Sequence, residues 1–290
     1  MESIFYYNGS LLKEGEAAIS PFNRGLHYGD GVFETMRSYA GHIFRFEDHV
    51  KRLLDGLEVL KIKAGRDSSE FYNAVEKVLR KNGLSDASVK IIAFRQGGEG
   101  PTPPADSKAS FLITARPFDH KRKARCEKGI RGYVVPIRRN NYSPVSFIKS
   151  LNYLNNILGR LEARDNNADE ALFLNILNKV AEGATSNVFI IKRGTVYTPP
   201  INAGILKGIT RDVVLQIAKQ TGVTCLERDF TMDELSEADE AFLTNSLMEI
   251  MPLVSVNDTH IGKGIPGDIT KQLMQSYKGL VKKELEIRNS

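Results

Sequence analysis

The segment Tyr28-Gly-Asp-Gly-Val-Phe-Glu-Thr-Met-Arg37 places one glycine on each side of an acidic residue. This spacing predicts a tight turn at Asp30, because glycine adopts backbone conformations that other residues avoid. Downstream of the turn, apolar residues at helical spacing predict a helix over 47–60. Arg52 lies on this helix, one turn after His49. It is either an exposed helix residue or a guanidinium that binds a phosphate, which its forked donors suit.

The rest of the N-terminal part combines short strands with a second helix. That helix is predicted over 69–81, with Gly83 as its stop signal. Runs of apolar or alternating residues predict strands over 3–7, 42–46, 88–95 and 109–116. Together these elements predict a smaller α+β domain over residues 1–118.

The C-terminal part shows the same mixture over a longer stretch. Strands are predicted over 132–137, 170–175, 188–192, 240–244 and 253–256. Helices are predicted over 151–164, 210–221 and 268–284. These elements predict a larger α/β or β-rich domain over residues 131–290.

A basic connector over residues 119–130 joins the two predicted domains. Its cationic residues are Lys121, Arg122, Lys123, Arg125 and Lys128. A basic run can bind nucleic acid, but no aromatic residues are interleaved with this one. We therefore expect a solvated linker and no nucleic-acid partner.

The composition excludes several classes of protein. The chain has 290 residues, of which 41% are hydrophobic and 26% charged, so we expect a globular protein with a large core. No apolar run is long enough to cross a bilayer, and the first residues lack a signal-peptide pattern. Cys126 and Cys225 stand far apart, which argues against a disulfide framework or a metal site. We expect a cytoplasmic protein without a membrane partner.

Two segments carry single charged residues among apolar neighbours. Lys149 follows Phe147 and Ile148. Burial would lower its pKa and make the neutral amine available for a Schiff base, whereas the alternative is a lysine that extends to solvent at a helix start. Glu182 precedes a predicted strand, and it either faces water or neutralises a protonated pyridine nitrogen.

Another pair of segments offers donors for an anion. Gly208, Ile209 and Thr210 open the helix predicted over 210–221, and helix N-termini attract anions. Asn245 and Ser246 follow the strand predicted over 240–244. The alternative is that Thr210 only caps its helix.

Taken in order, these motifs resemble one known family. They are Tyr-Gly-Asp-Gly-Val-Phe-Glu-Thr (28–35), Arg52, Phe-Ile-Lys-Ser-Leu-Asn-Tyr-Leu-Asn-Asn (147–156), Glu-Gly-Ala-Thr-Ser-Asn-Val-Phe (182–189), Leu-Lys-Gly-Ile-Thr-Arg (206–211) and Thr-Asn-Ser-Leu-Met-Glu-Ile-Met-Pro (244–252). The chain resembles the fold type IV pyridoxal-phosphate enzymes, also called class IV aminotransferases. The family includes branched-chain and D-amino acid aminotransferases and 4-amino-4-deoxychorismate lyase.

The resemblance implies a fold, a cofactor and a site. It implies a two-domain α/β (α+β) enzyme with pyridoxal 5′-phosphate at the domain interface, and a homodimer acting on a small amino-acid-like substrate. By resemblance, Lys149 forms the Schiff base and moves the proton at the substrate's α-carbon, while Glu182 holds the pyridine nitrogen protonated. The other implied cofactor-binding residues are Arg52, Leu206, Gly208, Ile209, Thr210, Asn245 and Ser246. The implied substrate-pocket residues are Phe33, Tyr28, Arg95 and Leu247.

The reaction is less sharply indicated than the cofactor. Asn245-Ser246-Leu247 is similar to the pattern of the lyases, whereas branched-chain enzymes usually have a Thr-Ala pair there. The loop 96–104 lacks the Arg-x-His motif of D-amino acid aminotransferases. We therefore expect the lyase, which eliminates pyruvate to give 4-aminobenzoate. The alternatives are an aminotransferase for D-amino or branched-chain amino acids, and a non-catalytic module that binds through the basic connector.

Overall fold

The chain divides into two units in the computed structural model, which describes residues 2–120 and 122–289. The N-terminal unit extends to Phe118 and also includes Ile148–Asn152. The C-terminal unit holds Asp119–Phe147 and the chain from Tyr153 onward. Residues 148–152 were expected in the C-terminal domain. They belong to the N-terminal unit because their backbone pairs with β3 (Gly31–Tyr39).

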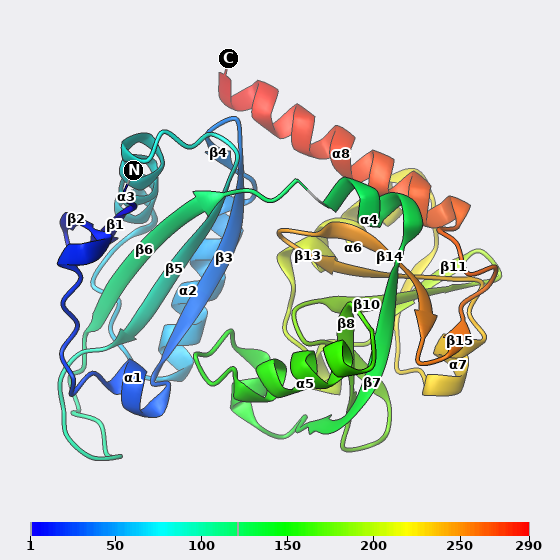
Figure 1. The fold of residues 1–290 in the computed structure, drawn as a ribbon, viewed down its shortest axis with the longest axis horizontal. Helices are drawn as coiled ribbons and strands as arrows, with labels where there is room; N and C mark the ends of the chain where they lie inside the picture. The colour runs from blue at the N-terminus through cyan, green and yellow to red at the C-terminus, as the bar shows by residue number, and fades with distance from the viewer. Residues whose placement is uncertain (1, 121, 290) are drawn as a thin grey trace. The chain divides into compact units, whose positions relative to one another are not determined.

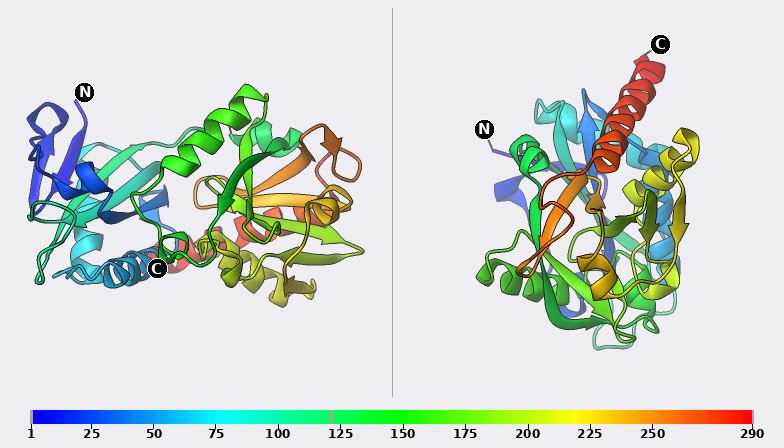
Figure 2. Two further views of the ribbon diagram at one scale, coloured as in Figure 1. Left: turned by 90° about the horizontal axis from the view of Figure 1, so that it is seen from below. Right: turned by 90° about the vertical axis from the view of Figure 1, so that its right-hand side faces the viewer.

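An antiparallel sheet of six strands forms the N-terminal unit, in the order β2-β1-β6-β5-β3-β4. Besides β3, its strands are β1 (Ile4–Tyr7), β2 (Ser10–Lys13), β4 (His42–Ile43), β5 (Ala87–Arg95) and β6 (Ala109–Pro117). Figure 2 shows the two long helices, α2 (Phe46–Val59) and α3 (Ser68–Lys81), on the same side of this sheet. Two short helices, η1 (Glu14–Glu16) and α1 (Arg24–Tyr28), precede β3.

Apolar periodicity explains why the two long helices form. Phe46, Val50, Leu53 and Leu57 lie on one side of α2 and are all buried. At the start of α3, Asp67 and Glu70 form a reciprocal capping box, an arrangement whose cap is worth about 1 kcal/mol. Both helices lie within two residues of their predicted bounds. The strand predicted over 42–46 is shorter, because Arg45 adopts a left-handed conformation (φ 56°) at the start of α2.

A mixed sheet of nine strands forms the C-terminal unit. Its main path is β12-β11-β10-β13-β14-β7-β8-β9. Because β9 also pairs with β10, the six strands from β10 to β9 along this path form a closed ring. The strands are β7 (Ile130–Arg139), β8 (Glu170–Asn175), β9 (Val180–Gly183), β10 (Asn187–Lys192), β11 (Thr195–Thr198), β12 (Cys225–Glu227), β13 (Glu240–Asn245), β14 (Glu249–Val256) and β15 (Thr259–His260). The last of these pairs with β14.

Helices pack around this closed sheet. They are α4 (Arg122–Lys128), η2 (Pro144–Phe147), α5 (Leu154–Asp165), η3 (Ile201–Ala203), α6 (Ile209–Thr221), α7 (Met232–Ser236) and α8 (Asp268–Asn289). Figure 1 shows α8 in red, and it packs on α6, β13 and β14. The helix predicted over 151–164 begins later, at Leu154, because Leu151 and Asn152 bond to the N-terminal unit.

The predicted connector is partly helical, since α4 occupies most of it. Lys121, one of its basic residues, lies outside the described residues. In the part of the chain that the structure describes, no helix has the length and apolar character needed to cross a membrane.

Candidate active site

Lys149 lies on a short extended segment, Ile148–Asn152, next to β3. The Phe33 amide donates to the Lys149 carbonyl at 2.8 Å, and Val32 and Ser150 form an antiparallel bridge. The Nζ atom of the half-buried Lys149 lies 4.4 Å from the centre of the Phe33 ring. An aromatic face attracts a cation at this distance. The fold thus brings together two residues that the sequence placed far apart.

A buried carboxylate orients Arg52. The Arg52 Nε and Nη2 atoms donate to the two carboxylate oxygens of Glu34 at 2.7 and 2.8 Å. Glu34 also lies 2.8 Å from Nδ1 of His49. Only 1% of Glu34 and 2% of His49 is exposed, whereas Arg52 is 15% exposed. A bidentate pair of this kind fixes the plane of the guanidinium.

The protonation states of this cluster follow from its charges. Burial opposes ionisation of Glu34, but the Arg52 charge and the hydrogen bond from His49 outweigh it and lower the pKa of Glu34 to about 2. Burial lowers the pKa of His49; its hydrogen bond to Glu34 opposes this effect, and the charges of Arg52 and Lys149 add to it. A neutral imidazole therefore faces an ionised carboxylate. Since that carboxylate can only accept, Nδ1 of His49 carries the proton.

Glu182 is held in the C-terminal unit by a backbone amide and a cation. One carboxylate oxygen accepts from the Leu206 amide at 3.0 Å, and the other lies 3.1 Å from Nε of Arg139. Arg139 in turn packs over the Phe173 ring at 4.3 Å and donates to Asn156 at 3.2 Å. These contacts give each oxygen of the buried Glu182 carboxylate a polar partner.

A protonated phenol lies in the same neighbourhood. Burial raises the pKa of Tyr153 to about 12, and the negative charges of Glu182 and Glu170 act in the same direction. The Tyr153 hydroxyl donates to the Ala184 carbonyl at 2.9 Å. This bond ties the start of α5 to the turn between β9 and β10.

The N-terminus of α6 is closely packed against Asn187. Gly208 precedes the helix, and a Cβ atom there would lie 2.0 Å from Oδ1 of Asn187. The Asn187 side chain also donates to the Leu206 carbonyl at 2.9 Å. Thr210 is buried in the first turn. Only glycine at 208 permits this approach of the backbone.

The turn between β13 and β14 is shaped by Asn245. Its side-chain oxygen accepts from the Leu247 and Met248 amides at 2.9 and 2.7 Å. Its side-chain nitrogen donates to the Thr185 carbonyl at 2.9 Å. Ser246 and Leu247 lie in this turn. The asparagine is therefore occupied by backbone groups of its own turn and of the β9–β10 turn.

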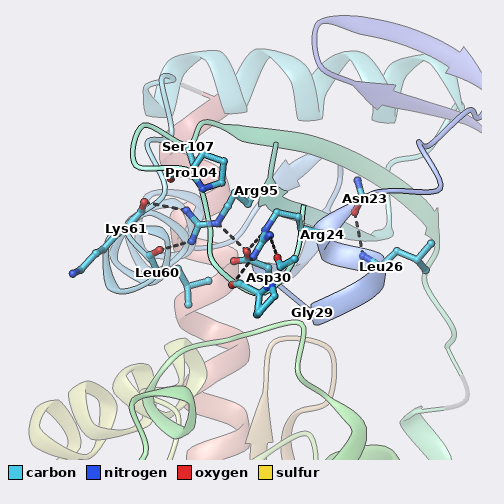
Figure 3. Close-up of polar contacts among 12 residues, drawn as sticks. Asn23, Arg24, Leu26, Gly29, Asp30, Leu60, Lys61, Arg95, Pro104 and Ser107 are labelled. Carbon is cyan, nitrogen blue, oxygen red and sulfur yellow. Dashed lines mark hydrogen bonds and ion pairs between the residues drawn. The ribbon is translucent and has the colours of Figure 1, made fainter. Parts of the chain in front are cut away.

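Two residues expected in the substrate pocket lie next to the turn before β3, Tyr28 at the end of α1 and Arg95 at the end of β5. Tyr28 ends α1, is 43% exposed, and lies beneath the Arg24 guanidinium at 4.9 Å. Arg95 is buried; it donates to Asp30 at 2.8 Å and to the Leu60 carbonyl at 2.6 Å, as Figure 3 shows. The Arg95 guanidinium is thus engaged by structural partners, and we withdraw it from the pocket.

Sequence reasoning missed four residues of these clusters. Glu34 follows the quoted turn, and its alternation with Val32 and Met36 on the buried side of β3 was the available signal. His49 shares the buried side of α2. Arg139 carried no local signal, since the pairing of β7 with β8 and of β8 with β9 brings it to Glu182. Asn187 lies in the quoted motif 182–189, but its contact with Leu206 depends on packing between segments.

Comparison with known proteins shows the enzyme family to which this chain belongs. The model of the family described as amino-transferase class IV matches residues 31–256, and the chain belongs to this family. A putative branched-chain-amino-acid aminotransferase of Methanocaldococcus jannaschii is 37% identical over 277 residues, covering 95% of each chain. An aminodeoxychorismate lyase of Bacillus subtilis is 32% identical over 282 residues, covering 96% of this chain and 95% of the relative.

Solved structures agree with this assignment. The branched-chain amino acid aminotransferase of Escherichia coli superposes with a TM-score of 0.91 at 31% identity, covering 97% of this chain and 95% of that one. The enzyme from Thermobaculum terrenum, solved in its PLP form, gives a TM-score of 0.88 at 31% identity, with 97% and 94% covered. The family uses pyridoxal 5′-phosphate, so the predicted fold, enzyme class and cofactor are confirmed.

The comparisons favour the aminotransferase alternative over the lyase that we expected first. That expectation depended on Asn245-Ser246-Leu247. Because Asn245 binds the backbone of its own turn, the segment reports turn geometry as well as substrate contacts. It is therefore a weak guide to the reaction.

Proposed function

We propose that this enzyme is an aminotransferase that moves the amino group of a branched-chain amino acid to a 2-keto acid. The placement of the Lys149 amine over the Phe33 ring carries the proposal, because it sets the reacting nitrogen beside an apolar wall. Such a wall suits an aliphatic side chain. The name of the M. jannaschii relative supports the same substrate class.

The N-terminal unit would contribute the covalent link and one phosphate ligand. When bound, pyridoxal phosphate supplies an aldehyde and a ring that accepts electrons. Lys149 would hold the cofactor through its amine and later move a proton at the α-carbon of the substrate. Arg52, already oriented by Glu34, would bind a phosphate oxygen.

The C-terminal unit would contribute the remaining cofactor contacts. Glu182, fixed by the Leu206 amide and Arg139, would pair with the protonated ring nitrogen. The amides of Ile209 and Thr210, at the start of a helix of 13 residues, would bind the phosphate dianion. Leu206 would pack on the ring, and Ser246 would donate to the phosphate.

The donor set fits this cofactor. Gly208 brings the start of α6 so close to Asn187 that a Cβ would fill the space between them. Thr244 lies on β13, opposite Asn187 on β10. Its buried hydroxyl has no hydrogen-bond partner among the described residues. An open helix N-terminus beside an unsatisfied hydroxyl is suited to a ligand rich in acceptor oxygens.

We also propose that the enzyme is a homodimer that pairs through α5. Four apolar residues at helical spacing are 41–65% exposed on this helix: Leu154, Ile157, Leu158 and Leu161. An exposed apolar stripe of this kind marks an interaction surface. Sedimentation should show a dimer for the wild type and a monomer for Leu158→Arg; a Leu158→Arg dimer would exclude α5.

A lyase remains the second candidate, because the B. subtilis relative covers as much of the chain as the aminotransferases do. Single-turnover spectroscopy separates the two. Mixed with L-leucine and no keto acid, the loaded enzyme should lose the visible absorbance of its cofactor and release one equivalent of keto acid. If leucine has no effect while aminodeoxychorismate yields pyruvate and 4-aminobenzoate, the lyase replaces our proposal.

A further inference from the structure

The segment that carries Lys149 is attached to one turn of the N-terminal unit, Gly29–Gly31. The Gly31 carbonyl accepts a hydrogen bond from the Leu151 amide at 2.9 Å. The Gly29 carbonyl accepts one from the Asn152 side chain at 3.0 Å. These bonds lie two and three residues beyond Lys149. The position of the turn therefore sets the backbone from which the lysine side chain projects.

Both glycines of the turn are required for this close approach. A Cβ atom on Gly31 would lie 2.3 Å from the Ala93 carbonyl oxygen and 2.9 Å from Cδ1 of Leu151. Gly29 has a φ of 61°, and a Cβ there would lie 3.2 Å from the Asn152 amide group. The two glycines thus allow the turn to pack closely against residues 151 and 152 of the lysine segment.

Asp30, between the glycines, is anchored by two buried arginines. Its Oδ2 atom accepts from Nε of Arg24 and from Nε of Arg95, both at 2.8 Å. Figure 3 shows the two guanidinium groups converging on this carboxylate. Arg24 and Arg95 are 3% and 4% exposed. One carboxylate therefore joins two cations that the fold has removed from water.

The outer sides of the two arginines donate to backbone carbonyls. Arg95 donates to the Leu60 carbonyl, at the C-terminal end of α2, at 2.6 Å. Arg24 donates to the Gly100 carbonyl at 2.6 Å. Asp30 is thereby connected to the helix that carries Arg52 and to the loop between β5 and β6.

The charge of Asp30 matters to this arrangement. Burial opposes ionisation of Asp30, but hydrogen bonds from Arg95 and Arg24 outweigh it and lower its pKa. Removing the negative charge would leave two buried cations without a counterion, which is costly. The exposed pair of Lys63 and Asp106 makes an ordinary surface contact at 2.7 Å, and pairs of that kind contribute little.

We propose that Asp30 is a positioning residue for Lys149. By anchoring the Gly29–Gly31 turn to the two arginines, it fixes the backbone of Leu151 and Asn152, and hence the place of the lysine amine. This inference rests on the proposed role of Lys149 as the covalent cofactor ligand. It assigns a function to the arginine pair, which binds no ligand in our account.

Two variants and one control test the proposal. Asp30→Asn removes the charge, Asn152→Ala removes one exposed hydrogen bond to the turn, and Asp106→Asn is the control. Hydrogen exchange of the Leu151 amide is measured with and without pyridoxal phosphate. The pH midpoint of the lysine-bound cofactor absorbance is measured on the loaded enzyme.

Both variants should speed Leu151 exchange, Asp30→Asn by about tenfold, which corresponds to the loss of one hydrogen bond to a charged group. Both should also move the pH midpoint, while Asp106→Asn does neither. If both variants keep wild-type exchange and midpoint and only melt at lower temperature, Asp30 merely stabilises the fold and the proposal is wrong. If Asp30→Asn does not fold, Asn152→Ala decides by the same two readouts.

The same measurements distinguish a failure of the proposed function from a failure of the inference about Asp30. A wild-type enzyme without lysine-bound cofactor would remove the role of Lys149, and with it the inference. A wild-type enzyme with lysine-bound cofactor, whose variants behave like the control, would overturn the inference alone.

Discussion

Arg52 and Glu34 are joined by two hydrogen bonds, from Nε at 2.7 Å and from Nη2 at 2.8 Å. Glu34 is the neighbour of Phe33, whose amide holds the Lys149 carbonyl. Two adjacent residues of β3 thus place the two cationic groups that we assign to the cofactor. The strand is the common support of the covalent link and the phosphate ligand.

Replacing Arg52 should weaken the binding of pyridoxal phosphate. Arg52→Ala removes a charge-assisted contact to phosphate, which we expect to cost about 1.5–3 kcal/mol, or roughly 10- to 150-fold in affinity. Equilibrium titration of the cofactor-free enzyme measures this. Lys51→Ala is the control, because Lys51 is on the same helix and its side chain is 75% exposed. Equal affinities in the two variants would limit Arg52 to its structural pair with Glu34.

Acid should destabilise the enzyme through Glu34. Its pKa is about 2 in the folded protein and ordinarily 4.5, so the ionised carboxylate stabilises the fold above pH 4.5. That contribution, on the order of 3 kcal/mol, is lost as the pH falls from 4.5 towards 2. Urea unfolding between pH 7 and pH 2.5 should show this loss in the wild type and a smaller one in Glu34→Gln. Parallel pH profiles of the two proteins would exclude Glu34 as the source.

Glu170 should affect the pH dependence of stability in the opposite direction from Glu34. Burial raises its pKa, although Arg160 and the Thr185 hydroxyl oppose the shift. Because the pKa of Glu170 is raised in the folded protein, this group favours folding below pH 4.5, where it is protonated in both states. That contribution to the free energy of unfolding is lost as the pH rises through the pKa of the folded protein. Glu170→Gln keeps an acceptor for Thr185 and should therefore be at least as stable as the wild type at pH 7. This advantage should disappear at pH 4 in the same urea experiment; a variant less stable at both pH values would refute the assignment.

Glu182→Gln should separate cofactor binding from turnover. The amide can still accept from Leu206, but it cannot balance a protonated ring nitrogen. We expect the cofactor to be retained and the turnover number to fall by about 100-fold or more, the effect of a lost charge-stabilising group. Glu237→Gln, at a residue 70% exposed, is the matched control. Full activity in Glu182→Gln would remove this residue from the mechanism.

Local periodicity was enough to predict much of the fold. The helices α2, α3 and α6 were predicted because apolar residues recur at helical spacing along one side of each. Strand β3 was missed, although it has nine residues. Glu34 and Ser38 are polar but buried in it, so its buried side did not read as apolar.

The sites could be predicted only where a motif carried them. Lys149 and Glu182 were found through family motifs, as were Phe33 and Leu206, but Arg139 was not. Arg139 reaches Glu182 through a contact between positions 43 residues apart in the printed sequence, and such pairs leave no local pattern. Arg95 was misplaced for the same reason: its partner Asp30 is 65 positions away.

The role of Lys149 as the covalent ligand is tested by identifying which lysine binds the cofactor. Two lysine Nζ atoms lie near the Phe33 ring, that of Lys149 at 4.4 Å and that of Lys90 at 5.1 Å. Borohydride reduction of the loaded enzyme, followed by digestion and mass spectrometry, locates the modified residue. We expect the cofactor mass on Lys149 alone in the wild type and on no lysine in Lys149→Ala. Modification of Lys90, or of no lysine in the wild type, would contradict it.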